Sequence, residues 1–221
     1  MTSSLPAELL EVLDRQVTTE LVTIDERGRP TAWPVTPSLH ADESCIDVDV
    51  VEAADPPANP HVALLLSDAD AERMVLVQGT AFVDDRVHVR PERVYAWPGA
   101  DAEAEPRLYD AHVEEVRSAH NEEPETGHPG PGGEATAWDA RLEDLDPTAA
   151  LAFVGPDGFP FAVRVPVAPD HAAGVVRIGA DPVGAPIESG PASLCARGLR
   201  ILGDLVEDRG DWLFRPHGIA G

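Results

Sequence analysis

Three histidines are the residues whose type and spacing most directly suggest chemistry in this chain. His112, His120 and His128 lie eight residues apart among many carboxylates, and histidine nitrogen is a common ligand of zinc. Only the first pair lies within one predicted helix, where eight residues is close to two turns. Solvated histidines on an acidic helix are the alternative interpretation, and we predict no metal site.

Other catalytic signatures are missing from the sequence. It contains no Ser-His-Asp signature and no dinucleotide-binding fingerprint, and the glycines of residues 130–133, GPGG, are not followed by the lysine of a P-loop. Cys45 and Cys195, the two cysteines, lie in strand-like patterns, so we expect buried small hydrophobes rather than nucleophiles. This sparse cysteine content and a first segment unlike a signal peptide predict a cytoplasmic location, with a single disulfide left open.

The charge of the chain excludes two classes of partner. The formal net charge is −24, from 40 acidic and 16 basic residues, and every basic residue is arginine. Such a surface repels the phosphates of nucleic acids and anionic lipids, so we expect neither nucleic acid nor membrane as a partner. Adaptation to high internal salt explains the acidity, and a surface that binds cations or a basic partner is the alternative.

A repeated segment indicates how the chain is organised. Residues 21–30, LVTIDERGRP, align without a gap with residues 151–160, LAFVGPDGFP. The alignment places Gly28 over Gly158, and glycine at this place suits a hairpin turn that needs a positive φ. Chance similarity is the alternative, but the length of 221 residues and the repeat together favour two β units.

Short alternating apolar runs predict six strands in each unit, after an opening helix over residues 4–16. The strands of the first unit are expected at residues 21–24, 31–39, 45–50, 61–66, 74–83 and 87–97. Those of the second unit are expected at residues 149–154, 159–167, 175–179, 192–197, 199–206 and 212–215. Six strands with short connections in each unit indicate small antiparallel barrels.

Four positions inside the predicted strands are expected to be irregular. Pro34 and Pro37 cannot donate to a ladder, so residues 31–39 should form an edge strand or a bulged strand. Gly79 predicts a bulge or the close approach of another backbone. Pro91 is expected to interrupt the strand over residues 87–97.

An acidic connector over residues 98–147 is expected to join a first unit, residues 1–97, to a shorter second unit, residues 148–221. The connector carries fourteen acidic residues and a stretch rich in glycine and proline. An apolar stripe predicts one helix over residues 106–120, and a second short helix is expected over residues 138–145.

Three motifs follow one another in a recognisable order. They are Gly28-Arg29-Pro30 before a strand with prolines, residues 59–64 (NPHVAL), and residues 77–81 (VQGTA) ahead of two aspartates. In this order they resemble the pyridoxamine 5′-phosphate oxidase-like family of FMN-binding split barrels, over residues 5–97 well and over residues 145–217 weakly. The resemblance implies a mainly β fold with two tandem split β-barrel units of six short strands and a few short helices. The flavin of the family lies in the groove between two paired barrels.

Candidate flavin contacts follow from the same resemblance. Trp33, Thr36 and Ser38 lie on the strand that the family uses for the flavin, with Trp33 available for stacking, and Gln78 belongs to the third motif. The alternative for each of them is that it is an ordinary strand residue without a ligand. We therefore predict that these four residues, together with Arg29 and Arg73, lie around one flavin.

The phosphate of FMN is the weak point of this prediction. The family grips it with a Lys or Arg pair, but the matching positions here are Val51 and Glu52. A carboxylate there would repel the phosphate by about 1–4 kcal/mol in a surface-like dielectric. Several arginines could compensate: Arg29, Arg73 and Arg86 in the first unit, and Arg164 and Arg197 in the second.

The resemblance predicts an FMN-binding protein and a flavin-dependent oxidoreductase that acts on a small-molecule substrate. Because a flavin carries the redox chemistry itself, no acid or base need stand out in the sequence. One alternative is a family member that has lost its cofactor and acts as a binding or structural protein. Another is a deazaflavin or haem in the same groove. The two units would pair within one chain as a pseudo-dimer, or two chains would form a homodimer.

Overall fold

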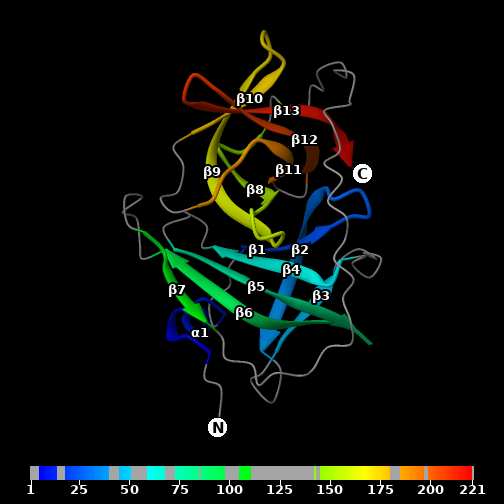
Figure 1. The fold of residues 1–221 in the computed structure, drawn as a ribbon, viewed down its shortest axis with the longest axis vertical. Coiled ribbons are helices and arrows are strands. Elements are labelled where there is room, and N and C mark those ends of the chain that lie inside the picture. Colours follow the sequence, from blue (N-terminus) through cyan, green and yellow to red (C-terminus); the bar gives the residue numbers. More distant parts are fainter. Residues whose placement is uncertain are drawn as a thin grey trace.

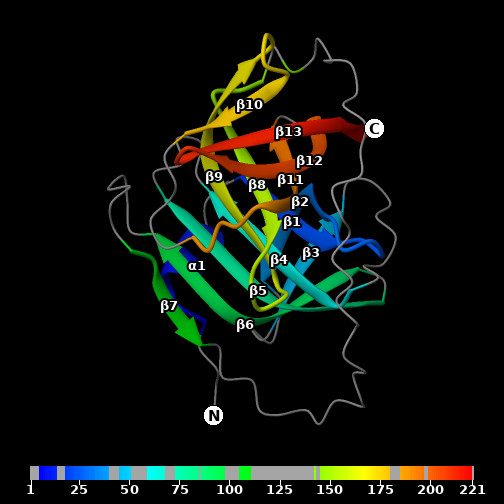
Figure 2. The ribbon, with the colours of Figure 1, turned by 45° about the horizontal axis from the view of Figure 1, so that its top comes forward.

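The computed structural model of the chain describes residues 5–13, 18–39, 45–50, 59–67, 73–84, 86–97, 105–110, 142, 145–179, 185–196 and 199–220. These residues form two β-barrels of six strands each, one stacked on the other (Figure 1). A second view shows the same two stacked units (Figure 2). The predicted fold class, mainly β with two tandem barrel units, is confirmed. No helix within the described ranges has both the length and the apolar character that crossing a membrane requires.

The first barrel follows the helix α1 (Ala7–Leu13), which buries Leu9 and Val12, three residues apart on one helical face. Its strands are β1 (Thr18–Ile24), β2 (Pro30–Leu39), β3 (Ile46–Val50), β4 (His61–Ser67), β5 (Met74–Val83) and β6 (Val87–Trp97). They are antiparallel in the order β3-β2-β1-β4-β5-β6, and pairing of β3 with β6 closes the barrel. A further strand, β7 (Arg107–Asp110), pairs with β6.

The second barrel repeats this arrangement strand for strand. Its strands are β8 (Thr148–Val154), β9 (Pro160–Asp170), β10 (Val175–Ile178), β11 (Gly190–Ala196), β12 (Leu199–Asp208) and β13 (Asp211–Ala220). They close in the order β10-β9-β8-β11-β12-β13, which is the order of the first barrel with each strand replaced by its counterpart. The turn glycines Gly28 and Gly158 have positive φ angles of 74° and 80°. The predicted repeat is confirmed.

A β-bulge lies at the same place in both barrels, where the register shifts at Gly79 of β5 and at Gly203 of β12. The extra residues are on the partner strands, Glu92 of β6 and His217 of β13. A Cβ on Gly79 would lie 2.0 Å from the carbonyl oxygen of Arg90, and a Cβ on Gly203 would lie 2.3 Å from that of Arg215. No side chain fits there, because the obstacle is backbone. Both expectations for Gly79 are confirmed, while β6 runs through Pro91 as a bulge rather than a break.

The prolines of β2 are accommodated by a change of partner along the strand. Residues 30–34 pair with β1, and residues 35–39 pair with β3. Within the described strands, each half of β2 therefore pairs on one side only. Pro34 and Pro37, which have no N–H to donate, can face the unpaired side. The strand is internal in the sheet order, so the expectation of an edge strand holds only for each half taken alone.

The two barrels share a continuous hydrophobic core. Alternate residues of β4, such as Leu64, point into the first barrel, and the residues between them, such as Leu65, pack with residues of the second barrel. This makes β4 a strand buried on both faces. The outward-facing residues of the first barrel in the shared cluster are Val22, Ala32, Ala63, Leu65, Met74, Leu76 and Trp97.

The predicted connector needs correction. Arg107–Asp110 is the strand β7, so the helix expected over residues 106–120 is wrong at these positions. The sequence around Leu108 has the apolar spacing of a helix, but pairing with the exposed edge of β6 satisfies its backbone instead. The rest of this segment lies outside the described residues. So does most of the helix expected over residues 138–145, of which Leu142 is described and is buried in the shared core.

Candidate functional site

The inter-barrel face is the first candidate site, because a flavin of the resembling family would lie there. It is formed by β1, β2, β4 and β5 of the first barrel against β8, β9, β11 and β12 of the second. Its apolar part is the shared core described above. Its polar part is made of a buried ion pair and of the turn between β8 and β9.

The buried ion pair joins Arg164 on β9 to Glu20 on β1, with side chains exposed by 11% and 4%. Arg164 Nε also donates a hydrogen bond of 3.0 Å to Oγ of Ser67, and its backbone N lies 3.2 Å from Sδ of Met74. Burial raises the pKa of Glu20 to about 6, although the nearby Arg164 guanidinium acts in the opposite direction. Arg164 is therefore a structural cation of the interface.

The turn between β8 and β9 also packs onto the first barrel. The ring of Phe159 stacks on His61 at a centroid distance of 4.1 Å, and the guanidinium of Arg93 lies 5.1 Å from the centroid of the same ring. Arg93 also forms an ion pair with Asp157 of the turn. Gln78 Nε2 donates a hydrogen bond of 3.0 Å to the carbonyl oxygen of Pro160.

These contacts account for two of the predicted flavin residues. Gln78 is buried under the β8–β9 turn. Trp33 does stack, but its partner is Arg200 of β12, whose guanidinium carbon lies 3.8 Å from the ring centroid. Trp33 Nε1 also donates to Oγ1 of Thr23 at 3.2 Å. Both side chains serve the contact between the barrels.

The other four candidates do not converge on one place. Arg29 is paired with Asp25 at 2.7 Å within its own turn. Thr36 and Ser38 are exposed on β2, on the strand face that carries Ala32. Arg73 directly precedes β5 and pairs with Glu11 of α1. The positions that match the phosphate-binding pair, residues 51 and 52, lie outside the described residues, as does residue 197.

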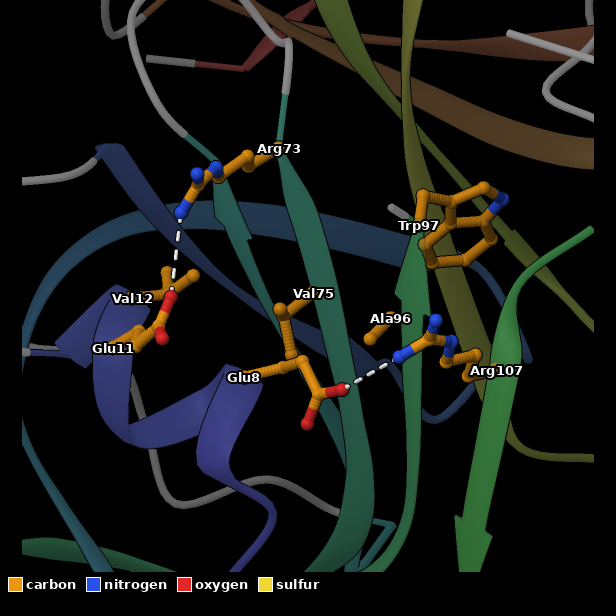
Figure 3. A pocket seen from close by; sticks show the side chains of 8 residues that line it. All are labelled: Glu8, Glu11, Val12, Arg73, Val75, Ala96, Trp97 and Arg107. Carbon is orange, nitrogen blue, oxygen red and sulfur yellow. Dashed lines mark hydrogen bonds and ion pairs between the residues drawn. The ribbon is translucent and has the colours of Figure 1, made fainter. Parts of the chain in front are cut away.

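A pocket beneath α1 is the second candidate site (Figure 3). Its volume is about 310 Å³, and it lies between the helix and strands β5, β6 and β7. Val12, Val75 and Ala96 provide apolar lining, with Trp97 beside them. The remaining lining residues are charged, namely Glu8, Glu11, Arg73 and Arg107.

The charged residues of this pocket form two ion pairs that tie the helix to the sheet. Arg73 Nη1 lies 3.3 Å from Oε2 of Glu11, and Arg107 Nη1 lies 3.2 Å from Oε1 of Glu8. Tyr109 donates a second hydrogen bond to the same oxygen of Glu8 at 2.6 Å, and this bond is the main cause of a lowered pKa for Glu8. Figure 3 shows the two ion pairs on opposite sides of Val75.

Most residues of this pocket could not be predicted from the sequence. Glu8 and Glu11 are three residues apart in the predicted opening helix, so they lie on one helical face. This spacing is the only sequence feature that relates these two pocket residues to each other. Arg107 fell within the wrongly predicted helix. Trp97 closes the last predicted strand of the first unit, and nothing in its spacing relates it to the N-terminal helix.

A histidine between two aspartates forms a third cluster of titratable groups. His88 Nδ1 lies 2.8 Å from Asp47 Oδ1, and its Nε2 lies 2.8 Å from Asp84 Oδ1. Two carboxylate partners favour the doubly protonated ring, so the pKa of His88 is raised, chiefly through Asp84. Asp47 and His88 face each other across β3 and β6. The cluster therefore reinforces the seam that closes the first barrel.

The described part of the chain was expected to hold neither a metal site nor a reactive cysteine. No group of three or more His, Cys, Asp or Glu residues there could hold a metal ion. His112, His120 and His128 lie outside the described residues. Cys45 and Cys195 are both buried and form no disulfide with each other, as expected for small core residues.

Comparison with known proteins adds no relative. No family model matches this chain, and no curated protein matches its sequence. Membership in the pyridoxamine 5′-phosphate oxidase-like family therefore stays a prediction, and function is inferred from the geometry.

Proposed function

We propose that this chain is a small-molecule-binding protein built on a duplicated barrel, in which the inter-barrel face joins the two halves and holds no flavin. One observation carries this proposal: the six candidate flavin residues do not surround a common space. Gln78 and Trp33 are engaged in contacts between the barrels, and Arg73 belongs to a pocket under α1. The pocket beneath α1 is the proposed binding site.

The electrostatics of the interface support the same conclusion. Arg164 was a candidate to replace the missing phosphate-binding pair, but it compensates Glu20 in a buried ion pair. Turning Arg164 toward a phosphate would leave the Glu20 carboxylate buried without its cation, which is strongly unfavourable. Glu52 would in addition repel the phosphate if it lies where the resemblance places it.

Flavin retention tests this proposal. The purified protein is incubated with FMN in molar salt, desalted, and examined for visible flavin absorbance before and after denaturation. We expect no flavin to remain with the protein. Retention of one FMN per chain would overturn the proposal, and the same experiment with a deazaflavin and with haem tests the other two cofactors.

A flavin-dependent oxidoreductase of the split-barrel class is the second candidate function. It is favoured by the exposed hydroxyl side chains of Thr36 and Ser38 on the strand that the resembling family uses for its flavin. If FMN binds, Glu52→Lys should tighten it at least tenfold, because a cation replaces a carboxylate at the phosphate. Glu26→Lys, the same charge change in an exposed turn, is the matched control. Equal effects of the two variants would place the phosphate elsewhere.

A further inference from the structure

The pocket beneath α1 combines an apolar lining with a rim of balanced charge. Two glutamates from one helix face two arginines from the sheet, so the rim has no net charge. Val12, Val75, Ala96 and Trp97 are each at most 9% exposed. The volume of about 310 Å³ lies at the lower end of the range for ligand pockets, so the ligand must be small.

The two ion pairs of the rim differ in how firmly they are held. Glu8 accepts hydrogen bonds from both Arg107 and Tyr109. The pair of Arg73 and Glu11 joins side chains that are 46% and 64% exposed at a distance of 3.3 Å. Exposed ion pairs of this kind contribute little to stability, so a ligand can replace this one at small cost.

We propose that the pocket binds a small zwitterion with an apolar side chain, of which an apolar α-amino acid is the simplest example. The carboxylate of the ligand takes the place of Glu11 on Arg73, and its ammonium group pairs with the carboxylate of Glu11. The apolar side chain lies over Val75 and Ala96 toward Trp97 (Figure 3). This proposal rests on the proposed function, since it names the ligand class of that site.

Charge balance selects a zwitterion over singly charged ligands. A zwitterion replaces one opened ion pair by two new ones, and every charged group keeps a partner. A monovalent anion would satisfy Arg73 and leave Glu11 without its cation, and it would also approach a chain of net charge −24. A monovalent cation would pair with Glu11 but offer no carboxylate to Arg73, and an uncharged apolar ligand would leave the rim unused.

Calorimetric titration with L-phenylalanine and two truncated analogues tests this assignment. We expect L-phenylalanine to bind, and 3-phenylpropanoate and 2-phenylethylamine to bind at least tenfold more weakly, because each lacks one of the two charges. Quenching or enhancement of tryptophan fluorescence that disappears in Trp97→Phe would locate the ligand. Equal affinity of all three compounds, or no binding of any of them, would overturn the proposal.

Variants with matched controls separate a specific site from general effects. Glu11→Gln and Arg73→Gln should each weaken L-phenylalanine at least tenfold, whereas Arg177→Gln, which opens the exposed pair with Asp170 in the second barrel, should not. Ala96→Leu should abolish binding by filling the pocket, and circular dichroism checks that this variant folds. Unchanged affinity in Glu11→Gln and Arg73→Gln would overturn the assignment even if Ala96→Leu fails to fold.

The proposed function and the ligand class can fail separately. A protein that retains FMN refutes the proposed function whatever the amino-acid titration shows. A protein that retains no FMN and ignores L-phenylalanine refutes only the zwitterion as ligand.

Discussion

The two barrels share their backbone plan and differ in the side chains that they present to each other. The bulge glycines Gly79 and Gly203 occupy equivalent places. The positions in the second barrel that correspond to Glu20 and Gln78 are Ala150 and Leu202, which are apolar. Residues that satisfy the backbone have been kept in both copies, while residues of the contact have diverged.

This divergence makes the contact between the barrels one-sided. Arg164 corresponds by register to Pro34, so the buried ion pair with Glu20 has Pro34 and Ala150 as its counterpart on the other side. Likewise Asp157 and Phe159, which pack on the first barrel, align with two arginines in the first hairpin. An interface between identical chains would repeat every contact twice, and a duplicated chain need not. The contact between the two barrels of this chain is therefore not repeated by a symmetric counterpart.

Arg164→Leu, which breaks the one-sided contact between the barrels, should have the largest effect on stability. It leaves Glu20 buried without a cation, so we expect the free energy of unfolding to fall by about 3–5 kcal/mol. The double variant Glu20→Leu with Arg164→Leu should lose less than Arg164→Leu alone, because no buried charge remains. Denaturant unfolding measures both, and an equal loss in single and double variants would show that the ion pair is not what the interface depends on.

The pH dependence of the same variant has a defined sign. Glu20 has a folded pKa of about 6, above its ordinary value, so folding is favoured by its protonation and this contribution is lost as the pH rises through about 6. Removing Arg164 removes a group that lowers this pKa, so the destabilisation should be largest above pH 6 and smaller in acid. A penalty independent of pH between about 4.5 and 7 would contradict this account.

Alanine at the two bulge glycines tests whether the shared backbone plan carries the same cost in both copies. Gly79→Ala and Gly203→Ala each place a methyl group against a carbonyl oxygen that cannot move away cheaply. We expect a loss of about 1–3 kcal/mol for each, as for overpacked cores. Gly190→Ala, at a site with nothing within 4 Å of the added Cβ, is the control and should change thermal stability less. Very different losses at Gly79 and Gly203 would show that the bulges are not equivalent.

His88→Leu makes the first barrel resemble the second, which has Leu213 at the corresponding position. Loss of the charged hydrogen bonds to Asp47 and Asp84 should cost about 1–2 kcal/mol at pH 6. Because the folded pKa of His88 is raised, this stabilisation is complete below about pH 6.5 and disappears as the pH rises through the folded pKa. The wild-type melting temperature should therefore fall toward that of His88→Leu in alkali, and a constant difference up to pH 9 would contradict this.

Most strands could be predicted, because their signals are local. Alternation marked β5 and β12, and the repeated turn sequence around Gly28 and Gly158 located two hairpins at once. Predicting β7 as a helix failed for the opposite reason. Its few residues have no strand signal of their own, and the free edge of β6 determines their conformation.

The candidate site could be predicted far less well than the fold. Arg73 was named as a candidate flavin residue, but the sequence does not show that its neighbour is Glu11, 62 positions earlier in the chain. Trp33 was expected to stack, and it does, but Arg200 comes from the other barrel. A contact between distant segments leaves no periodicity that a reader of the sequence could detect.

The sequence by itself determined that this chain is a duplicated β protein with an acidic surface, since turns, alternation and charge are properties of short segments. Only the tertiary structure decided what lies between the copies and beneath α1. Burial and pairing of charges, as for Glu20 with Arg164 and Glu11 with Arg73, depend on which strands face each other. The closure and stacking of the barrels determine which strands are neighbours. They therefore also determine which residues hold the two halves together and which residues line the pocket.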